Sequence, residues 1–125
     1  MMKKIISILL IAVMVFSFTA CLDSGSSDDG IDEENYVTYE FRNDKLLDQH
    51  FHKHGIEMGF DDAESYEKAA SDVVNNTYAL HKTEKEDGDD VYYLEDTNEF
   101  VIVSGDGYIR TYFLPNAGKA YYDRQ

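Results

Sequence analysis

The chain has 125 residues, and 25 acidic against 11 basic residues give it a formal net charge of −14 at pH 7. A single cysteine excludes an internal disulfide, so the fold depends on its hydrophobic core. The acidic balance counts against a nonspecific nucleic-acid binder, because phosphate contacts favour a basic surface. It suits a protein that stays soluble at a crowded surface or that binds a basic partner.

Residues 1–20 predict an export signal, because two lysines precede an almost unbroken apolar run over residues 5–18. The segment Phe18-Thr19-Ala20-Cys21 resembles the lipobox of bacterial lipoproteins, in which the cysteine is lipidated and becomes the mature N-terminus. We therefore expect an exported chain, anchored through lipidated Cys21 at the outer face of the cytoplasmic membrane. The alternatives are ordinary cleavage after Ala20 and an uncleaved membrane anchor.

The remaining chain divides into a spacer and one domain. Residues 21–34 are rich in serine, aspartate and glycine and contain little that can be buried, which predicts a flexible acidic tether. Residues 35–125 are long enough for one small domain.

The domain is predicted to begin with a short strand over residues 36–42, followed by a helix over 44–54. Asn43 is a candidate N-cap for this helix, and Gly55 would end it. At about 100° per residue, one broad side of the helix carries both apolar and basic positions. These are Leu46, Leu47, His50, Phe51, Lys53 and His54.

A second helix is predicted to run from a cap at Asp61 to about Asn75, because Asp61 and Glu64 have the spacing of a capping box. Its apolar positions indicate a core helix without chemistry. A short strand is expected over 77–82, followed by a charged loop over 84–90.

The last third of the chain has the clearest strand pattern. Strands are predicted over 91–94, 99–104 and 108–114, with a tight hairpin between the last two and a closing helical turn over 118–124. Helices followed by such strands predict an α+β domain, in which N-terminal helices pack on a C-terminal antiparallel β-meander.

Three of the four histidines lie within five residues, beside Lys53. Metal-free attack on a phosphodiester requires a base that is neutral near pH 7 and a cation that stabilises the developing anion. We therefore interpret this segment as a candidate nuclease site with His54 as base, Lys53 or Arg110 as the cation, and His50 or a tyrosine as acid. The alternative is that these histidines are structural groups at the margin of the core.

Residues 106–113 add a hydroxyl, a guanidinium and aromatic rings on a predicted strand. In a regular strand Ile109, Thr111 and Phe113 share one face and Arg110 lies on the other. Arg110 can then join Thr111 in one pocket only through a bulge, or else it forms an ion pair with an acidic neighbour.

A metal site is the other chemical possibility. His50, His54 and Glu57 have spacings compatible with metal ligands, but the chain has no HExxH motif and no second thiol. We therefore expect no metal and no other cofactor.

The order and spacing of these residues resemble colicin D-like ribonuclease domains and related bacterial toxin tips, within the wider group of barnase-like and RelE-like ribonucleases. The similarity covers roughly residues 46–122. The matching residues are Lys53, His54, Glu57, Gly59, Thr97, Asn98, Asp106, Gly107, Thr111 and Phe113, and the toxin tips add His50, Phe51, Ile109, Arg110, Tyr112, Pro115 and Gly118.

The resemblance implies a metal-independent endoribonuclease toxin that cuts RNA, with tRNA as the expected substrate. It makes His54 the base with support from Lys53, and gives Thr111 the place of a site hydroxyl and Phe113 that of an aromatic substrate contact. Phe51 matches the toxin tips but departs from the colicin D domain, which has a lysine at that position.

The resemblance also implies a cognate immunity protein as a partner, and we expect the domain to be a monomer. His50 and Arg110 join Phe113 as candidate substrate-binding residues. The alternative function is a non-enzymatic acidic surface lipoprotein that binds a protein partner, for example an immunity-like protein that masks a basic toxin.

Overall fold

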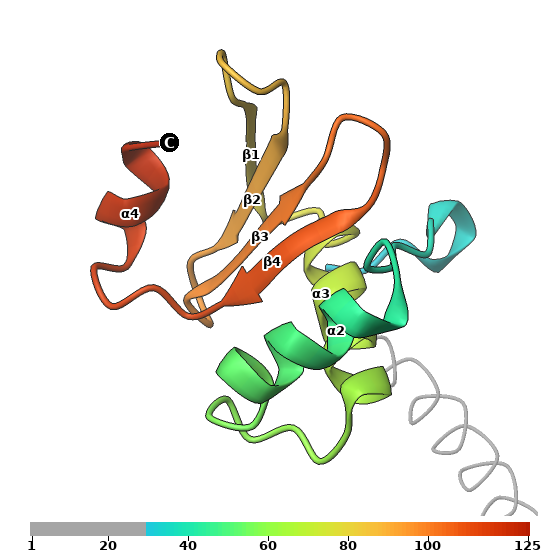
Figure 1. The fold of residues 1–125 in the computed structure, drawn as a ribbon. Helices are drawn as coiled ribbons and strands as arrows, with labels where there is room; N and C mark the ends of the chain where they lie inside the picture. The colour runs from blue at the N-terminus through green and yellow to red at the C-terminus, as the bar shows by residue number, and fades with distance from the viewer. Residues whose placement is uncertain (1–29) are drawn as a thin grey trace, which may run out of the picture.

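The computed structural model describes residues 30–125 (Figure 1). The elements are a 3-10 helix η1 (Glu33–Asn35), α2 (Asp44–His50), a π-helical turn η2 (Phe51–Gly55), α3 (Ala63–Val74), β1 (Leu80–Thr83), β2 (Asp90–Leu94), β3 (Glu99–Val103), β4 (Ile109–Phe113) and α4 (Lys119–Asp123). The predicted signal peptide, Cys21 and most of the predicted tether lie outside the described residues. Across residues 30–125, no helix has the length and apolar character needed to cross a membrane.

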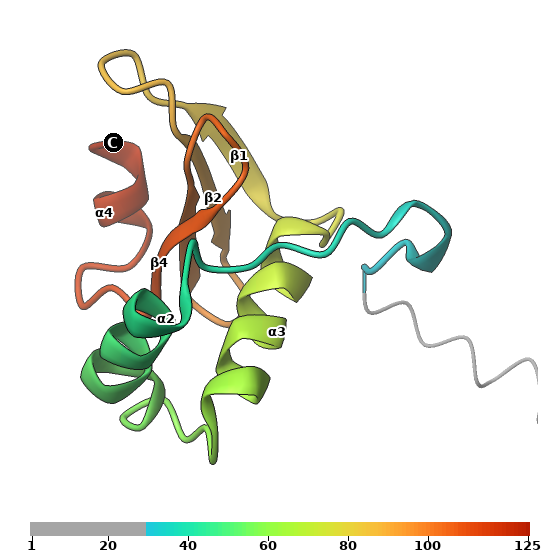
Figure 2. The same ribbon diagram turned by 45° about the vertical axis from the view of Figure 1, so that its right-hand side comes forward.

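The four strands form one antiparallel sheet in the order β1-β2-β3-β4. Helix α3 packs against one face and α4 against the other, while α2 and η2 lie beside the edge strand β4 (Figures 1 and 2). The predicted α+β fold, with helices first and an antiparallel meander after them, is confirmed. The sheet is apolar on both faces because each face is covered by a helix.

The larger core lies between α3 and the sheet, around Tyr66. The Tyr66 side chain is fully buried, and its hydroxyl donates a hydrogen bond of 2.5 Å to the backbone carbonyl of Tyr112. Its ring lies 5.0 Å from that of Tyr112 and about 6 Å from those of Phe41 and Phe51. This aromatic cluster joins α3, β4 and η2, and it therefore fixes the segment that carries the histidines.

The strand predicted over residues 36–42 is wrong. This segment is extended, but its only ladder contact within the described chain is the single parallel bridge between Phe41 and Ile109. Its backbone groups instead bond side chains of α3: Tyr39 N–H donates to Ser71 Oγ at 2.9 Å, and Phe41 N–H to Glu67 at 2.9 Å. Alternation alone could not reveal that a helix supplies the partners.

Two predicted boundaries also move. The cap of α3 is Asp62 rather than Asp61, because the Asp62 carboxylate accepts from Ser65 N–H at 2.7 Å. The described part of the predicted tether contacts the domain: the Gly30 carbonyl accepts from Thr77 N–H at 2.7 Å, and Ile31 forms a bridge with Asn76. Residues 30–34 therefore contact the domain rather than extending away from it.

Candidate functional site

The histidine segment is helical throughout, as predicted, but its second half is a π-helical turn. Asn43 caps the helix by accepting from Leu46 N–H at 2.9 Å. After His50 the helix changes to a wider π-helical turn, in which Ile56 N–H donates to the Phe51 carbonyl five residues earlier. Such π-turns are rare and are frequently found at functional sites. The rings of His50 and His54 remain neighbours, with centroids 6.1 Å apart.

Gly55 lets this turn approach α3 closely. A Cβ atom at Gly55 would lie 2.6 Å from Phe51 Cδ1 and 2.8 Å from Tyr66 Cδ1, both closer than packing allows. The predicted role of Gly55 as the end of the helix is only part of the reason for a glycine here. Its missing side chain also determines where the neighbouring His54 stands.

His54 contacts the end of β4. Its imidazole stacks on the ring of Phe113, with centroids 5.1 Å apart and an interplanar angle of 25°. Phe113 is itself held by Phe100 and Tyr121, at centroid distances of 5.3 and 5.5 Å. A hollow of about 430 Å³, which we call the His54 hollow, is lined by His54, Glu57, Met58, Phe113, Leu114 and Asn116.

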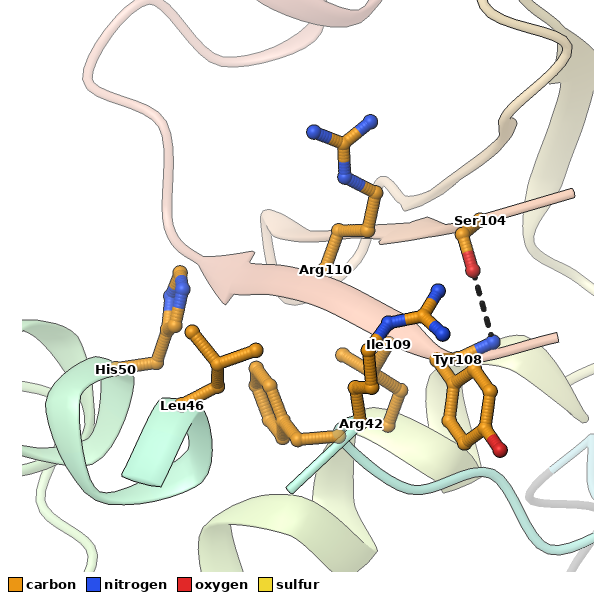
Figure 3. A pocket seen from close by; sticks show the side chains of 8 residues that line it. Arg42, Leu46, His50, Ser104, Tyr108, Ile109 and Arg110 are labelled. Carbon is orange, nitrogen blue, oxygen red and sulfur yellow. Dashed lines mark hydrogen bonds between the residues drawn. The ribbon is translucent and has the colours of Figure 1, made fainter. Parts of the chain in front are cut away.

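His50 faces a second cavity of about 460 Å³, between α2 and β4 (Figure 3). This His50 cavity is lined by Phe41, Arg42, Leu46, His50, Ser104, Tyr108, Ile109 and Arg110. The His50 ring lies 5.2 Å from that of Phe41, and its Nδ1 atom is buried without a hydrogen-bond partner among the described residues. A buried nitrogen without a partner is uncommon and costs free energy.

The surroundings lower the pKa of both imidazoles from the ordinary 6.5. For His50 the main cause is burial, followed by repulsion from His54 and Lys53. For His54 burial again comes first and Lys53 second, while Glu57 acts in the opposite direction. Both imidazoles are therefore mainly neutral at pH 7, which is the form that accepts a proton.

Arg110 is an extra residue in β4. Ile102 pairs with Thr111, whereas the adjacent Val103 pairs with Ile109, so the strand bulges between these two pairs. The guanidinium also forms an ion pair of 2.5 Å with Asp89, whose carboxylate is buried. Both structural alternatives considered for Arg110, a bulge and an acidic partner, are thus present.

The bulge changes which residues of β4 share a face. Ile109 and Tyr112 pack in the core between the sheet and α3, which we call the α3-side core. Phe113 packs in the core between the sheet and α4, which we call the α4-side core. The prediction that Ile109, Thr111 and Phe113 share one face is therefore wrong for Ile109. Thr111 lies opposite Ile102, another member of the α4-side core, and so stays on the side of Phe113.

The structure brings together some of the predicted site residues and not others. His54 contacts Phe113, and His50 shares a cavity with Arg110. Lys53 is exposed and acts on both histidines through its charge. Thr111 is half-buried and lines neither the His54 hollow nor the His50 cavity.

Sequence reasoning missed Arg42 and Tyr108. The Arg42 guanidinium lies 4.4 Å from the centre of the Tyr108 ring and donates to both carboxylate oxygens of Asp106, at 2.9 and 2.8 Å. Arg42 stood at the end of a segment predicted as a strand, and nothing in its neighbours indicated chemistry. Its contacts depend on the parallel bridge that places Phe41 beside Ile109.

The described residues contain one group of three acidic ligands, Glu84, Asp87 and Asp89, whose oxygens lie within 4.8 Å of one another. Asp89 is already paired with Arg110. Over residues 30–125, His50, His54 and Glu57 do not form a comparable group.

No family model matches the chain, and no curated protein is significantly similar to it. The geometry alone offers two neutral imidazoles, an exposed lysine, two arginines and a stacked aromatic ring around two adjoining hollows. These groups suit general acid–base catalysis on an anionic ester.

Proposed function

We propose that this domain is a metal-independent endoribonuclease of the colicin D-like kind. The observation that supports the proposal is the stacking of His54 on Phe113, which joins the two segments singled out from the sequence. A neutral imidazole next to an aromatic ring can accept a proton from a ribose hydroxyl while the ring holds a base. The second imidazole, His50, lies one helical turn away.

In the proposed reaction His54 removes the proton from the 2′-hydroxyl of a ribose. The 2′-oxygen then forms a bond to the adjacent phosphorus, and the bond between phosphorus and the 5′-oxygen breaks. The leaving oxygen takes a proton from protonated His50, so the products are a 2′,3′-cyclic phosphate and a 5′-hydroxyl. Lys53 stabilises the negative charge on the phosphorane.

The proposal extends to the biological setting. An exported chain, anchored through Cys21 and acting as a toxin on RNA of other cells, would need an immunity protein to protect its producer. The net charge of −14 slows encounter with RNA, so we expect modest cleavage rates that depend on a specific site rather than on general RNA affinity.

The test is cleavage of tRNA and of total RNA by the purified mature chain in the presence of EDTA. We expect cyclic-phosphate ends, and a loss of about 10²- to 10⁴-fold in rate for His54→Ala, which removes a general base. His52→Ala is the matched control, because His52 is exposed and its imidazole contacts only its helix neighbours Asp48 and Phe51 among the described residues. Equal rates for the two variants would reject His54 as the base.

The chain's acidity favours a second candidate function, binding of a basic protein without catalysis. Intact RNA after long incubation with a folded sample would favour this binder. Expression of residues 22–125 inside a bacterium separates the two cheaply. Growth arrest relieved by His54→Ala supports the ribonuclease, whereas harmless accumulation supports the binder.

A further inference from the structure

The His50 cavity differs in charge from the chain that contains it. The whole sequence has 25 acidic residues, yet none of the eight residues that line this cavity is acidic. Its polar lining residues are Arg42, Arg110, His50, Ser104 and Tyr108. Figure 3 shows His50 on one side, Arg42 and Tyr108 on the other, and Arg110 projecting from β4.

The two arginines are positioned by carboxylates that do not line the cavity. Arg42 Nη2 donates hydrogen bonds to the Asp106 carboxylate, and Arg110 Nη1 donates one to the Asp89 carboxylate. A guanidinium has five N–H donors. Within residues 30–125 these are the only hydrogen bonds recorded for either guanidinium, so each keeps donors for a ligand.

His50 adds a further polar group to the same cavity. Its Nδ1 is buried without a partner in the described part of the chain. A ligand that brought a hydrogen-bonding group to this ring would reduce that cost. The same ring lies 6.1 Å from the ring of His54, so the His50 cavity adjoins the proposed cleavage site.

We infer that the His50 cavity binds a phosphate group, through Arg42 and Arg110, next to the phosphate that is cleaved at His54. Forked guanidinium donors match phosphate oxygens in geometry and in charge. The exposed ring of Tyr108 lies beside them. That the phosphate belongs to RNA rests on the proposed ribonuclease function, whereas binding of the anion does not require cleavage.

The direct test titrates the mature chain with inorganic phosphate while NMR follows the His50 ring and Tyr108 signals. We expect saturable shifts that chloride at equal ionic strength does not produce. Loss of one charged hydrogen-bond donor in Arg42→Gln or Arg110→Gln should weaken phosphate binding by about tenfold or more. The absence of saturable shifts would overturn the inference.

A matched pair of variants separates anion binding from loss of structure. Arg42→Gln and Asp106→Asn break the same ion pair, so a purely structural role predicts similar effects for both. A phosphate site predicts opposite effects, because Asp106→Asn removes a competing anion and frees the guanidinium. Tighter phosphate binding by Asp106→Asn supports the inference, and equal weakening in both variants overturns it.

An RNA oligonucleotide separates this inference from the proposed function. A deoxyribose at the cleavage position prevents attack, so binding is measured without cleavage. His54→Ala should abolish cleavage of ordinary RNA and still bind phosphate. Phosphate binding by a protein that cleaves no RNA would support the anion site and reject the ribonuclease. Cleavage with an unchanged KM in both arginine variants would reject the anion site and keep the ribonuclease.

Discussion

The two hollows on either side of the histidine pair have different linings. The His50 cavity contains two guanidiniums and no carboxylate, whereas the His54 hollow contains Glu57, the Phe113 ring and the Asn116 amide. One lining suits an anion, and the other suits a neutral planar group with a proton acceptor beside it. A nucleotide carries both kinds of group, and this combination supports the proposed ribonuclease function.

The proposed function requires an acidic chain to accept a polyanion at a site of local positive charge. The two guanidiniums are concentrated in the His50 cavity, and their own carboxylate partners, Asp89 and Asp106, lie outside its lining. Surface carboxylates far from the cavity have little effect on an anion bound inside it, because salt screens exposed charges beyond about 8–10 Å. The net charge therefore limits the encounter rate more than it limits binding inside the site.

The largest effect that separates the two hollows is expected from Phe113→Leu. Leucine keeps apolar contact with Phe100 and Tyr121 but cannot stack on a base. Because base stacking contributes about 1–3 kcal/mol, RNA cleavage at low substrate should fall by roughly 5- to 150-fold. Phosphate binding in the His50 cavity should not change.

Phe113→Tyr is the control for this prediction, since it keeps the ring and should keep most of the activity. Steady-state kinetics on a short RNA would measure the change as a rise in KM. A fall in phosphate binding equal to the fall in cleavage would show that the two hollows are not separate subsites.

The next effect is expected from Gly55→Ala, which disturbs the element that both hollows share. The added methyl group would collide with Phe51 and Tyr66, at 2.6 and 2.8 Å. Overpacking of this kind costs about 1–3 kcal/mol, measured as a lower midpoint in urea unfolding. Cleavage should fall as well, because the displaced turn carries His54.

Gly105→Ala is the matched control, since the nearest atom to its added Cβ is the Gly88 carbonyl oxygen at 3.6 Å, an ordinary contact. We expect almost unchanged unfolding and cleavage for this variant. If Gly55→Ala were as stable as the control, the close approach of η2 to α3 would not determine the position of His54.

The sequence predicted most of the fold because its signals are local. The capped helix over 44–54 and the three closing strands have strong periodicity or turn residues, and the structure contains them within one or two residues. The segment 36–42 failed because its backbone partners are side chains on α3, such as Ser71 and Glu67, which strand alternation cannot identify.

The site was less predictable, because it depends on contacts between distant segments. His50, Lys53 and His54 were found through local spacing. The bulge at Arg110 was only one of two alternatives, since it depends on register with β3. Arg42 was missed entirely, because its pair with Asp106 spans 64 residues of sequence.

A smaller effect is expected in the pH dependence of cleavage. The rate needs neutral His54 and protonated His50, so it rises with pH through the first pKa and falls through the second. Burial first, and then the charge of Lys53, lower both pKa values from 6.5, with His54 adding to the effect on His50, so the optimum should lie below pH 6.5. The apparent pKa values of the rising and falling parts of the pH–rate profile describe the interacting pair of histidines rather than either histidine alone.

A pH–rate profile of kcat/KM on a short RNA measures this optimum. His50→Gln should remove the falling limb and leave the rising one. A falling limb that survives in His50→Gln would assign the acid to another group, such as a tyrosine.

The smallest effect is expected from Lys53→Gln on the titration of the histidines. The exposed ammonium of Lys53 lowers the pKa of both His50 and His54 by repulsion. Its removal should raise both pKa values and move the pH optimum of cleavage upward, as NMR of the ring signals and the rate profile would show. Lys45→Gln is the control, because Lys45 is an exposed lysine of α2 that does not contribute to the lowered pKa of either histidine.

Lys53 also distinguishes two roles through the size of the rate change. If its charge acts only on the histidines, the maximal rate at the shifted optimum should stay close to that of the wild type. If Lys53 contacts the phosphorane, the maximal rate should fall by about tenfold or more at every pH, because a charged hydrogen bond to the transition state is lost. In both cases phosphate binding in the His50 cavity should persist, since Lys53 is not one of its lining residues.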